Sequence, residues 1–401
     1  MTATPARQER PRIAFVDHIA QISGGEIALI RLVEGLGDRV EAHVILGEDG
    51  PLGPALEQAG ATVHVLPMRE SLRDTRKETI KPGALGVAAV TESARYLRDL
   101  RALLKRIDPD VVHTNSLKSS LIGGLAARAA RKPVLWHVRD RISSDYLPTP
   151  AVWLVRGLSL VVPSSIIVNS EATAGTLPRR STVIHDVVPA APDLPARASG
   201  AHDTVVIGMV GRLAPWKGQE VFLRAFARAA DGRRLRARLI GSAMFGEDDY
   251  VASLHRLCAD LGIVDVVDFR GFQSDVWGEL AALDILVHAS VTPEPFGQVV
   301  IEGMAAGVAV IAADAGGPAE VVTGGVDGLL VPMSDVAGLT AAIARLADDP
   351  QLRTRIAAAG KARSAHFDPE KVATGVLEAY ARLSTKTSRR RRVTRHPAGV
   401  S

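Results

Sequence analysis

The sequence predicts an α/β fold made of two doubly wound, Rossmann-like domains that face each other across a cleft. One observation is that short apolar runs alternate with helical patterns, which is typical of βαβ units and a parallel sheet. A second is that this alternation stops at one proline-rich stretch and then restarts. A third is the length of 401 residues, which is enough for two or three domains.

Residues 12–187 are interpreted as an N-terminal domain, because helical patterns lie between most of their apolar runs. Strands are expected at Arg12–Val16, Ala42–Leu46, Thr62–Leu66, Asp110–His113, Val134–Val138, Ile166–Asn169 and Thr182–Ile184. Helices are expected to include Glu26–Leu36, Ala84–Ile107 and Lys118–Ala130. The stretch 188–203 then reads as a linker, since three prolines fall close together and small polar residues follow.

Residues 204–368 are interpreted as a C-terminal domain of similar construction. Strands are expected at Thr204–Met209, Ala237–Ile240, Val266–Phe269, Ile285–His288, Val308–Ala312 and Gly328–Val331. Helices are expected at Gln219–Ala230, Asp249–Leu261, Asp275–Leu283, Gly297–Ala306 and Val336–Ala347. A last helix, residues 369–384, could cross back to the first domain. Residues 385–401 are expected to be a basic, disordered tail.

Composition narrows the class of protein. The chain is 47% hydrophobic and 23% charged, as globular proteins are. Its single cysteine, Cys258, excludes a disulfide framework and a cysteine-based zinc site. The polar N-terminus lacks the apolar core of a signal peptide, and no apolar run is long enough to span a membrane. We therefore expect a cytoplasmic protein.

The formal net charge of +4 includes two basic groups. One is in the tail, at residues 389–392 and Arg395, and the other consists of Arg95, Arg98, Arg101, Lys105 and Arg106. The ordinary interpretation of the first group is a solvated tail, and that of the second is a solvated helix face. The alternative is attraction to anionic lipid headgroups, which would place the protein peripherally at the inner face of the membrane. Nucleic acid is not expected, because only 4% of residues are aromatic and no binding motif is present.

The most informative stretch runs from Val291 to Gly307, after the apolar run Ile285–His288. Two prolines hold Glu294 in a loop at the carboxyl end of this strand, and Glu302 follows in the next helix. Ionised carboxylates only accept hydrogen bonds, so the pair suits a ligand rich in hydroxyl groups. The ordinary interpretation is a solvated loop residue and a favourable charge early in a helix.

Three glycine-containing turns accompany it. Gly211, Arg212 and Lys217 lie in the turn after the second domain's first strand, where two cations and a helix N-terminus suit a diphosphate. Gly24 and Gly25 follow the first strand of the first domain, and Gly316 and Gly317 follow a later strand of the second. Paired glycines let a backbone approach phosphate closely, although a plain helix start explains each pair as well.

In these motifs the chain resembles the retaining glycosyltransferases of glycosyltransferase family 4, which have the GT-B fold. The resemblance implies that Arg212 and Lys217 hold the diphosphate of a nucleotide-sugar donor, that Glu294 contacts the transferred sugar, and that Glu302 contacts the ribose. It also implies that Phe296, Gly297 and the 316–317 turn lend backbone amides, and that the 24–25 turn closes over the phosphates. His137 is similar to a histidine that faces the acceptor in related enzymes, although a strand histidine is often a core residue; His113 shares this ambiguity.

Two departures from the family pattern stand out. An Asn-Gly turn is common after the last strand of the first domain, whereas this chain has His185 and Asp186. The first domain also matches in pattern more than in motif, so the acceptor is left open as a glycan, a lipid-linked molecule or a small molecule.

The resemblance implies sugar transfer with retention and no cofactor or metal. Asp108 and Asp110 have the spacing of a metal-binding pair, but they lead directly into a strand and fit a turn. Another GT-B enzyme, such as a nucleotide-sugar epimerase or a phosphorylase, and a non-catalytic sugar-nucleotide-binding protein stay open. A nicotinamide oxidoreductase is disfavoured, because no G-x-G-x-x-G opens either sheet.

Overall fold

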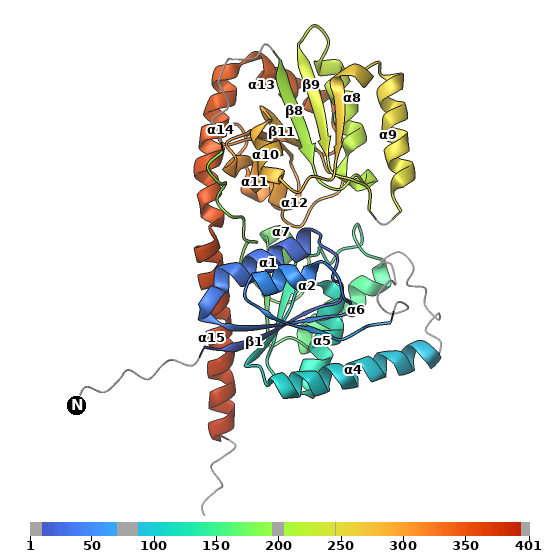
Figure 1. Cartoon of the computed structure of the whole chain (residues 1–401). Coiled ribbons are helices and arrows are strands. Elements are labelled where there is room, and N and C mark those ends of the chain that lie inside the picture. Colours follow the sequence, from blue (N-terminus) through green and yellow to red (C-terminus); the bar gives the residue numbers. More distant parts are fainter. Residues whose placement is uncertain (1–9, 70–86, 195–203, 245, 394–401) are drawn as a thin grey trace, which may run out of the picture. The chain divides into compact units, whose positions relative to one another are not determined.

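The computed structural model describes residues 10–69, 87–194, 204–244 and 246–393. The chain divides into two compact units. Unit 1 contains the residues up to Val187 together with those from Pro369 onward, and unit 2 is Val188–Asp368. Each unit is built on one parallel sheet, and the α/β class with two Rossmann-like domains is confirmed (Figure 1).

Unit 1 has the strand order β3-β2-β1-β4-β5-β6-β7. Its strands are β1 (Arg12–Asp17), β2 (Glu41–Leu46), β3 (Thr62–Val65), β4 (Val111–Thr114), β5 (Val134–Val138), β6 (Ser165–Val168) and β7 (Thr182–Val183). Its helices are α1 (Gly24–Leu36), the short η1 (Gly37–Arg39), α2 (Leu52–Gln58), α4 (Val87–Ile107), α5 (Leu117–Ala129), α6 (Thr149–Val161), α7 (Glu171–Ala174) and α15 (Pro369–Val393). The central strands β4 and β5 are buried throughout, because helices cover both faces of the sheet.

The two faces of this sheet have separate cores. Helices α1, α2 and α15 pack on one face, and α4, α5 and α6 pack on the other (Figure 1). In α15 the inward side chains recur every three or four residues, from Val372 through Val376 and Tyr380 to Leu383. The last helix of the chain is therefore part of unit 1.

The end of α15 differs from the sequence expectation. The helix continues past Ser384 to Val393, so residues 385–393 are helical rather than disordered. The physical reason is that no glycine or proline interrupts this stretch, and lysine and arginine favour helix. Residues 394–401 lie outside the described part of the chain.

Unit 2 has the strand order β10-β9-β8-β11-β12-β13. Its strands are β8 (Val205–Val210), β9 (Leu235–Ile240), β10 (Val267–Gly271), β11 (Ile285–His288), β12 (Ala309–Ala313) and β13 (Leu329–Val331). Its helices are η3 (Pro215–Lys217), α8 (Gln219–Ala229), α9 (Asp248–Asp260), η4 (Val264–Val266), α10 (Val276–Ala281), α11 (Gln298–Ala305), α12 (Gly316–Val321), α13 (Val336–Asp348), α14 (Pro350–Ser364) and η5 (Ala365–Phe367). Val188, the first residue of the expected linker, is buried in this unit and donates its amide to the carbonyl of Phe367.

Both sheets reverse their strand order once, between β1 and β4 in unit 1 and between β8 and β11 in unit 2. In open α/β sheets, ligands bind outside the carboxyl ends of the strands at such a reversal. The loops after these four strands are therefore the places to examine for a site. Among the described helices, none has both the length and the apolar character needed to cross a membrane.

Candidate active site

The two strongest sequence motifs meet at the reversal point of unit 2. Lys217 lies in η3, after β8, and Glu294 lies in the loop after β11. The Nζ of Lys217 is 2.7 Å from Oε1 of Glu294, and the two side chains are 16% and 9% exposed. Strands β8 and β11 are far apart in the sequence but are neighbours in the parallel sheet. This pairing of the strands brings the two side chains together.

The protein contacts of the Glu294 carboxylate fall on one of its two oxygens. Oε1 accepts a hydrogen bond from Lys217, another from the hydroxyl of Ser290, and lies 3.0 Å from Nε2 of His288. Among the described residues, Oε2 has no protein partner. Burial by itself raises the pKa of Glu294, but Lys217 and His288 hold that pKa well below its ordinary value. Glu294 is therefore an anion with one oxygen available to accept a ligand hydroxyl.

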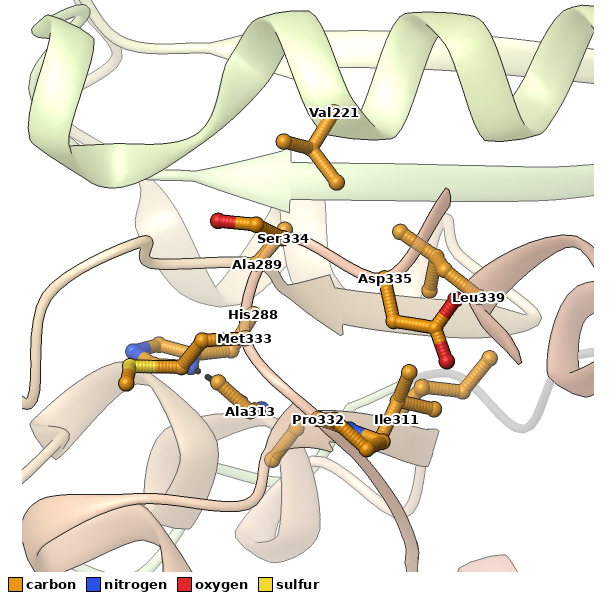
Figure 2. Close-up of a pocket in the computed structure, with 12 residues that line it drawn as sticks. Val221, His288, Ala289, Ile311, Ala313, Pro332, Met333, Ser334, Asp335 and Leu339 are labelled. Atoms are coloured by element: carbon orange, nitrogen blue, oxygen red, sulfur yellow. Dashed lines mark hydrogen bonds between the residues drawn. The ribbon is translucent and has the colours of Figure 1, made fainter. Parts of the chain in front are cut away.

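The orientation of His288 follows from its other nitrogen. The backbone N–H of Ala313 points at Nδ1 from 3.5 Å, which turns Nε2 toward Glu294. Figure 2 shows this ring beside Met333, at the edge of a small cavity lined also by residues of β12 and the loop after β13. The cavity holds about 10 Å³, room for about one water molecule. It is too small to hold a sugar.

Arg212 and Lys217 share an aromatic neighbour. The Lys217 ammonium lies 4.4 Å from the centre of the Trp216 ring, and the Arg212 guanidinium lies 5.5 Å from it. Nε of Arg212 is 3.3 Å from Glu247, just before α9. Trp216 thus positions both cations at the carboxyl end of β8, where a diphosphate would meet the helix that follows.

Glycines let the loops of unit 2 pack backbone against backbone. Gly316 has φ +63°, and a Cβ there would lie 2.3 Å from the carbonyl oxygen of Glu294. The amide of Gly317 donates to that same carbonyl over 2.9 Å. This N–H is already engaged, and its effect is to fix the glutamate loop. Gly297, with φ +86°, forms the N-cap of α11 against Pro318.

The remaining predicted donor residues of unit 2 lie in or beside these loops. Gly211 adopts φ +138° at the end of β8, close to Gly241. The Phe296 side chain is buried, with its ring 5.9 Å from that of Phe367. Glu302 is half-buried on α11. Phe296 is therefore a core side chain, and only its backbone lies at the loop surface.

In unit 1 the Gly24–Gly25 turn opens α1. Ser23 caps the helix and forms a capping box with Glu26. Asn115, after β4, donates to the carbonyl of Gly25 over 3.2 Å. Apart from chain neighbours and the backbone of α1 itself, no atom of the described residues lies within 4 Å of the position a Cβ would take on either glycine, so this backbone is open on one side. Burial and the nearby Asp17 raise the pKa of Glu26 to about 7.

His137 lies inside a buried polar network rather than on an open surface. Its side chain is 2% exposed. Its Nδ1 is 3.1 Å from Nε2 of His113 and 3.2 Å from the guanidinium of Arg139. His113 in turn lies 2.6 Å from the hydroxyl of Tyr380 on α15. Burial, reinforced by Arg139, lowers the pKa of His113 to about 3 and that of His137 well below its ordinary value. Both rings are neutral at physiological pH.

This network ends in charged groups at the carboxyl edge of the sheet. Arg139 is paired with Asp186 and donates to Asn115, which donates to Asp17 over 2.7 Å. Burial lowers the pKa of Arg139 to about 9, so it stays a cation at neutral pH. His137 has the surroundings of a core histidine, and a role toward the acceptor stays a prediction.

Comparisons with known proteins agree with this geometry. A model described as "Glycosyl transferases group 1" matches residues 195–363, and one described as "Glycosyl transferase 4-like domain" matches residues 23–191. A D-inositol 3-phosphate glycosyltransferase of Streptomyces scabiei is 31% identical over 317 residues, which are 72% of this chain and 71% of that protein. The chain belongs to the group 1 glycosyltransferases. The family interpretation made from the motifs is confirmed.

Solved structures support the same assignment. Anabaena HepE, in a complex with UDP and glucose, is 29% identical with a TM-score of 0.80, over 92% of this chain and 99% of that one. A sucrose-phosphate synthase from Thermosynechococcus elongatus has a TM-score of 0.75 at 21% identity, which bears on the fold alone. The GT-B assignment of this glycosyltransferase is thus shown.

Sequence reasoning missed several residues of the unit 2 site. They are Trp216, Ser290, His288 and Glu247. His288 and Ser290 stand at the carboxyl end of an apolar strand, a position that would have identified them as candidates. Trp216 lies between the two predicted cations in the sequence.

The two aspartates weighed as a metal pair have other partners. Asp108 pairs with Lys132, and Asp110 accepts the backbone amide of Arg12 over 2.9 Å. Within the described ranges no group of three or more metal-ligating side chains occurs. Independence from metal stays an expectation.

Proposed function

We propose that this glycosyltransferase moves a sugar from a nucleoside-diphosphate sugar to an acceptor hydroxyl with retention of anomeric configuration, in the synthesis of a glycan, glycolipid or other glycoconjugate. The observation that carries the proposal is the Lys217–Glu294 pair at the reversal point of unit 2. HepE, which is similar over almost its whole length, binds UDP and glucose in its crystals. UDP-sugars are therefore the first donors to examine.

The donor site would use the unequal oxygens of Glu294. Lysine has three N–H donors, and Glu294 engages one of them, so Lys217 can serve a phosphate oxygen without leaving the carboxylate. Oε2 of Glu294 would accept a sugar hydroxyl. Arg212 would add a second cation to the diphosphate, and Glu302 would accept from the ribose. The amides around Gly297 and Gly316 complete the proposed contacts.

The reaction breaks the bond between the anomeric carbon and the β-phosphate oxygen, and the electron pair leaves with the diphosphate. A bond then forms from the acceptor oxygen to the same face of the anomeric carbon, and the acceptor proton passes to the departing phosphate. Negative charge grows on the leaving group, so Lys217 and Arg212 stabilise the transition state more than the bound donor. In this chemistry Glu294 is an anion that positions the sugar, and the acceptor oxygen is the nucleophile.

The acceptor must offer a hydroxyl group. Several similar proteins act, by name, on D-inositol 3-phosphate, and one of 38% identity over 156 residues acts in lipopolysaccharide core biosynthesis. An acceptor panel should therefore contain a phosphorylated polyol and an oligosaccharide. Unit 1 would hold this acceptor.

The test begins with thermal shift in UDP-, GDP- and ADP-sugars, because a ligand that binds the native state raises the melting temperature. The best donor is then incubated with the acceptor panel, and the product anomer is determined by NMR. A product with the donor's anomeric configuration supports the proposal. Inverted configuration refutes retention, sugar 1-phosphate formation from inorganic phosphate identifies a phosphorylase, and donor binding without any turnover favours a binding protein.

A further inference from the structure

Two histidines face each other at one edge of the unit 1 sheet. His43 lies on β2, and His64 lies on the edge strand β3. In the parallel register His43 stands beside Thr62, two residues before His64. Alternate side chains of a strand share a face, so both rings project from the same side of the sheet. Nδ1 of His43 is 3.0 Å from Nε2 of His64, and the two ring planes are 21° apart.

The carboxylate of Glu41 fixes the proton position on His43. Oε1 of Glu41 is 3.0 Å from Nε2 of His43 and 3.0 Å from Nε of Arg12. An ionised carboxylate only accepts hydrogen bonds, so Nε2 carries the proton of the neutral His43 ring and Nδ1 carries a lone pair. Nδ1 of His64 has no partner among the described residues. It is therefore free to hold the proton of its own ring, which leaves a second lone pair on Nε2.

Two nitrogen lone pairs at this spacing suit a metal ion. With metal–nitrogen bonds of about 2.0–2.1 Å, nitrogens 3.0 Å apart subtend an angle of about 90–97° at the metal. Neighbouring ligands have this angle in the square-planar and tetragonal geometries of Cu²⁺ and Ni²⁺, whereas tetrahedral Zn²⁺ needs a wider one. A metal-binding histidine commonly donates its other N–H to a carboxylate, and Glu41 occupies that position.

The surroundings favour an ion that seeks nitrogen ligands. Arg12 neutralises Glu41, and Arg106 of α4 acts on His64 as a nearby cation. Net charge therefore attracts no cation here, and only the imidazole nitrogens do. Ca²⁺ and Mg²⁺ prefer oxygen ligands, whereas imidazole suits Cu²⁺ and Ni²⁺. Within the described ranges no third ligating side chain joins the pair, so water would complete the coordination.

We propose that His43 and His64 form a surface site for one divalent transition-metal ion of the Cu²⁺ or Ni²⁺ type, with Glu41 positioning His43. The His43 side chain is 14% exposed and His64 is half-buried, so an ion reaches both from solvent. Glu41 is the first residue of β2, which places the site toward the amino ends of the strands. The site is therefore separate from the sugar transfer proposed above, and it implies no metal in that reaction.

The experiment is calorimetric titration of Ni²⁺ into the full chain without a histidine tag. The wild type should bind one ion per chain. His64→Gln keeps a side-chain N–H that can donate to His43 but removes a metal-binding nitrogen. It should weaken Ni²⁺ binding at least about a hundredfold, and Glu41→Gln, which removes only the positioning carboxylate, about tenfold. The matched control is His255→Gln, at an exposed histidine of unit 2, and should bind like the wild type.

Two further readouts do not depend on calorimetry. Ni²⁺ should raise the melting temperature of the wild type and of His255→Gln but not that of His64→Gln, because the native state alone brings β2 and β3 together. Bound Cu²⁺ should show electron paramagnetic resonance splitting from two nitrogens in the wild type and from one in His64→Gln. Absence of Ni²⁺ binding to the wild type would overturn the proposal. Equal binding in His64→Gln and the wild type would also overturn it, since the ion is then an adventitious ion only.

Discussion

The two units have the same architecture and use the carboxyl edges of their sheets in opposite ways. In unit 2, Lys217 and Glu294 are paired with each other but keep N–H and oxygen positions without protein partners among the described residues. In unit 1, His137, Arg139 and Asp186 direct their polar atoms at one another and are at most 7% exposed. A ligand needs hydrogen-bonding capacity that the fold has not already used. Unit 2 therefore has the stronger claim to the donor, and unit 1 uses its buried charges for structure.

The largest expected effect separates these two uses. Lys217→Ala removes the cation proposed to stabilise the leaving diphosphate, so kcat should fall about 10²–10³-fold. It also leaves Glu294 buried without its main counter-charge, so the melting temperature should fall. The control is Arg224→Ala, which removes an exposed cation of α8 that pairs with Glu220. Donor turnover and thermal melting are measured on both. Full activity in Lys217→Ala would remove Lys217 from the proposed mechanism.

The network of unit 1 predicts a structural effect of comparable size. Arg139→Met leaves Asp186 charged, buried and without its cation, which should lower the free energy of unfolding by about 3–5 kcal/mol. Arg139→Met/Asp186→Asn should recover part of this loss, because no unpaired charge remains. Chemical denaturation measures all three proteins. Arg233→Met, at an exposed pair with Asp348, is the control and should behave like the wild type. If Arg139→Met changes the free energy of unfolding as little as Arg233→Met does, the network does not stabilise the fold.

The sequence predicted the site residues of unit 2 better than the buried network of unit 1. Lys217 and Glu294 each stand in a short local motif, and the strand pattern alone places both loops at one sheet edge. Tyr380 and His113 are 267 residues apart, and no local pattern relates them. The strands themselves were predictable, because most of them contain a short run of apolar residues between turns. The small helices α2 and α7 and the extent of α15 depended on packing or on the absence of stop signals.

A pH effect of intermediate size tests whether Glu26 belongs to the buried polar groups of unit 1 that affect its stability. Its pKa is about 7 in the folded protein and 4.5 ordinarily, so the folded state binds more protons between these values. Its contribution to stability is therefore complete below about pH 4.5 and is lost as the pH rises through 7. Across this range the loss should amount to about 3 kcal/mol. Glu26→Gln keeps a residue suited to the capping box and should remove this loss.

Denaturation of the wild type and Glu26→Gln at pH 5 and pH 8 measures the difference. The neutral histidines act oppositely, because His113 and His137 have lowered pKa values and destabilise the fold as the pH falls below 6.5. Comparing the two proteins at each pH cancels that common contribution. Parallel pH profiles would mean that Glu26 is ionised in the folded protein throughout.

The smallest expected effect concerns the junction of α15 with β4. Tyr380→Phe removes the hydroxyl 2.6 Å from His113 and leaves the buried Nδ1 without its partner, which should cost about 1–3 kcal/mol of stability. Tyr250→Phe is the matched control in unit 2, because its hydroxyl meets Gln219 at 3.2 Å and the residue is half-buried. That substitution should cost less. Donor KM should stay unchanged in Tyr380→Phe, since the lost bond belongs to unit 1. If the donor KM rises in Tyr380→Phe, the polar network of unit 1 takes part in donor binding. The contrast between a ligand-binding sheet edge in unit 2 and a structural one in unit 1 is then wrong.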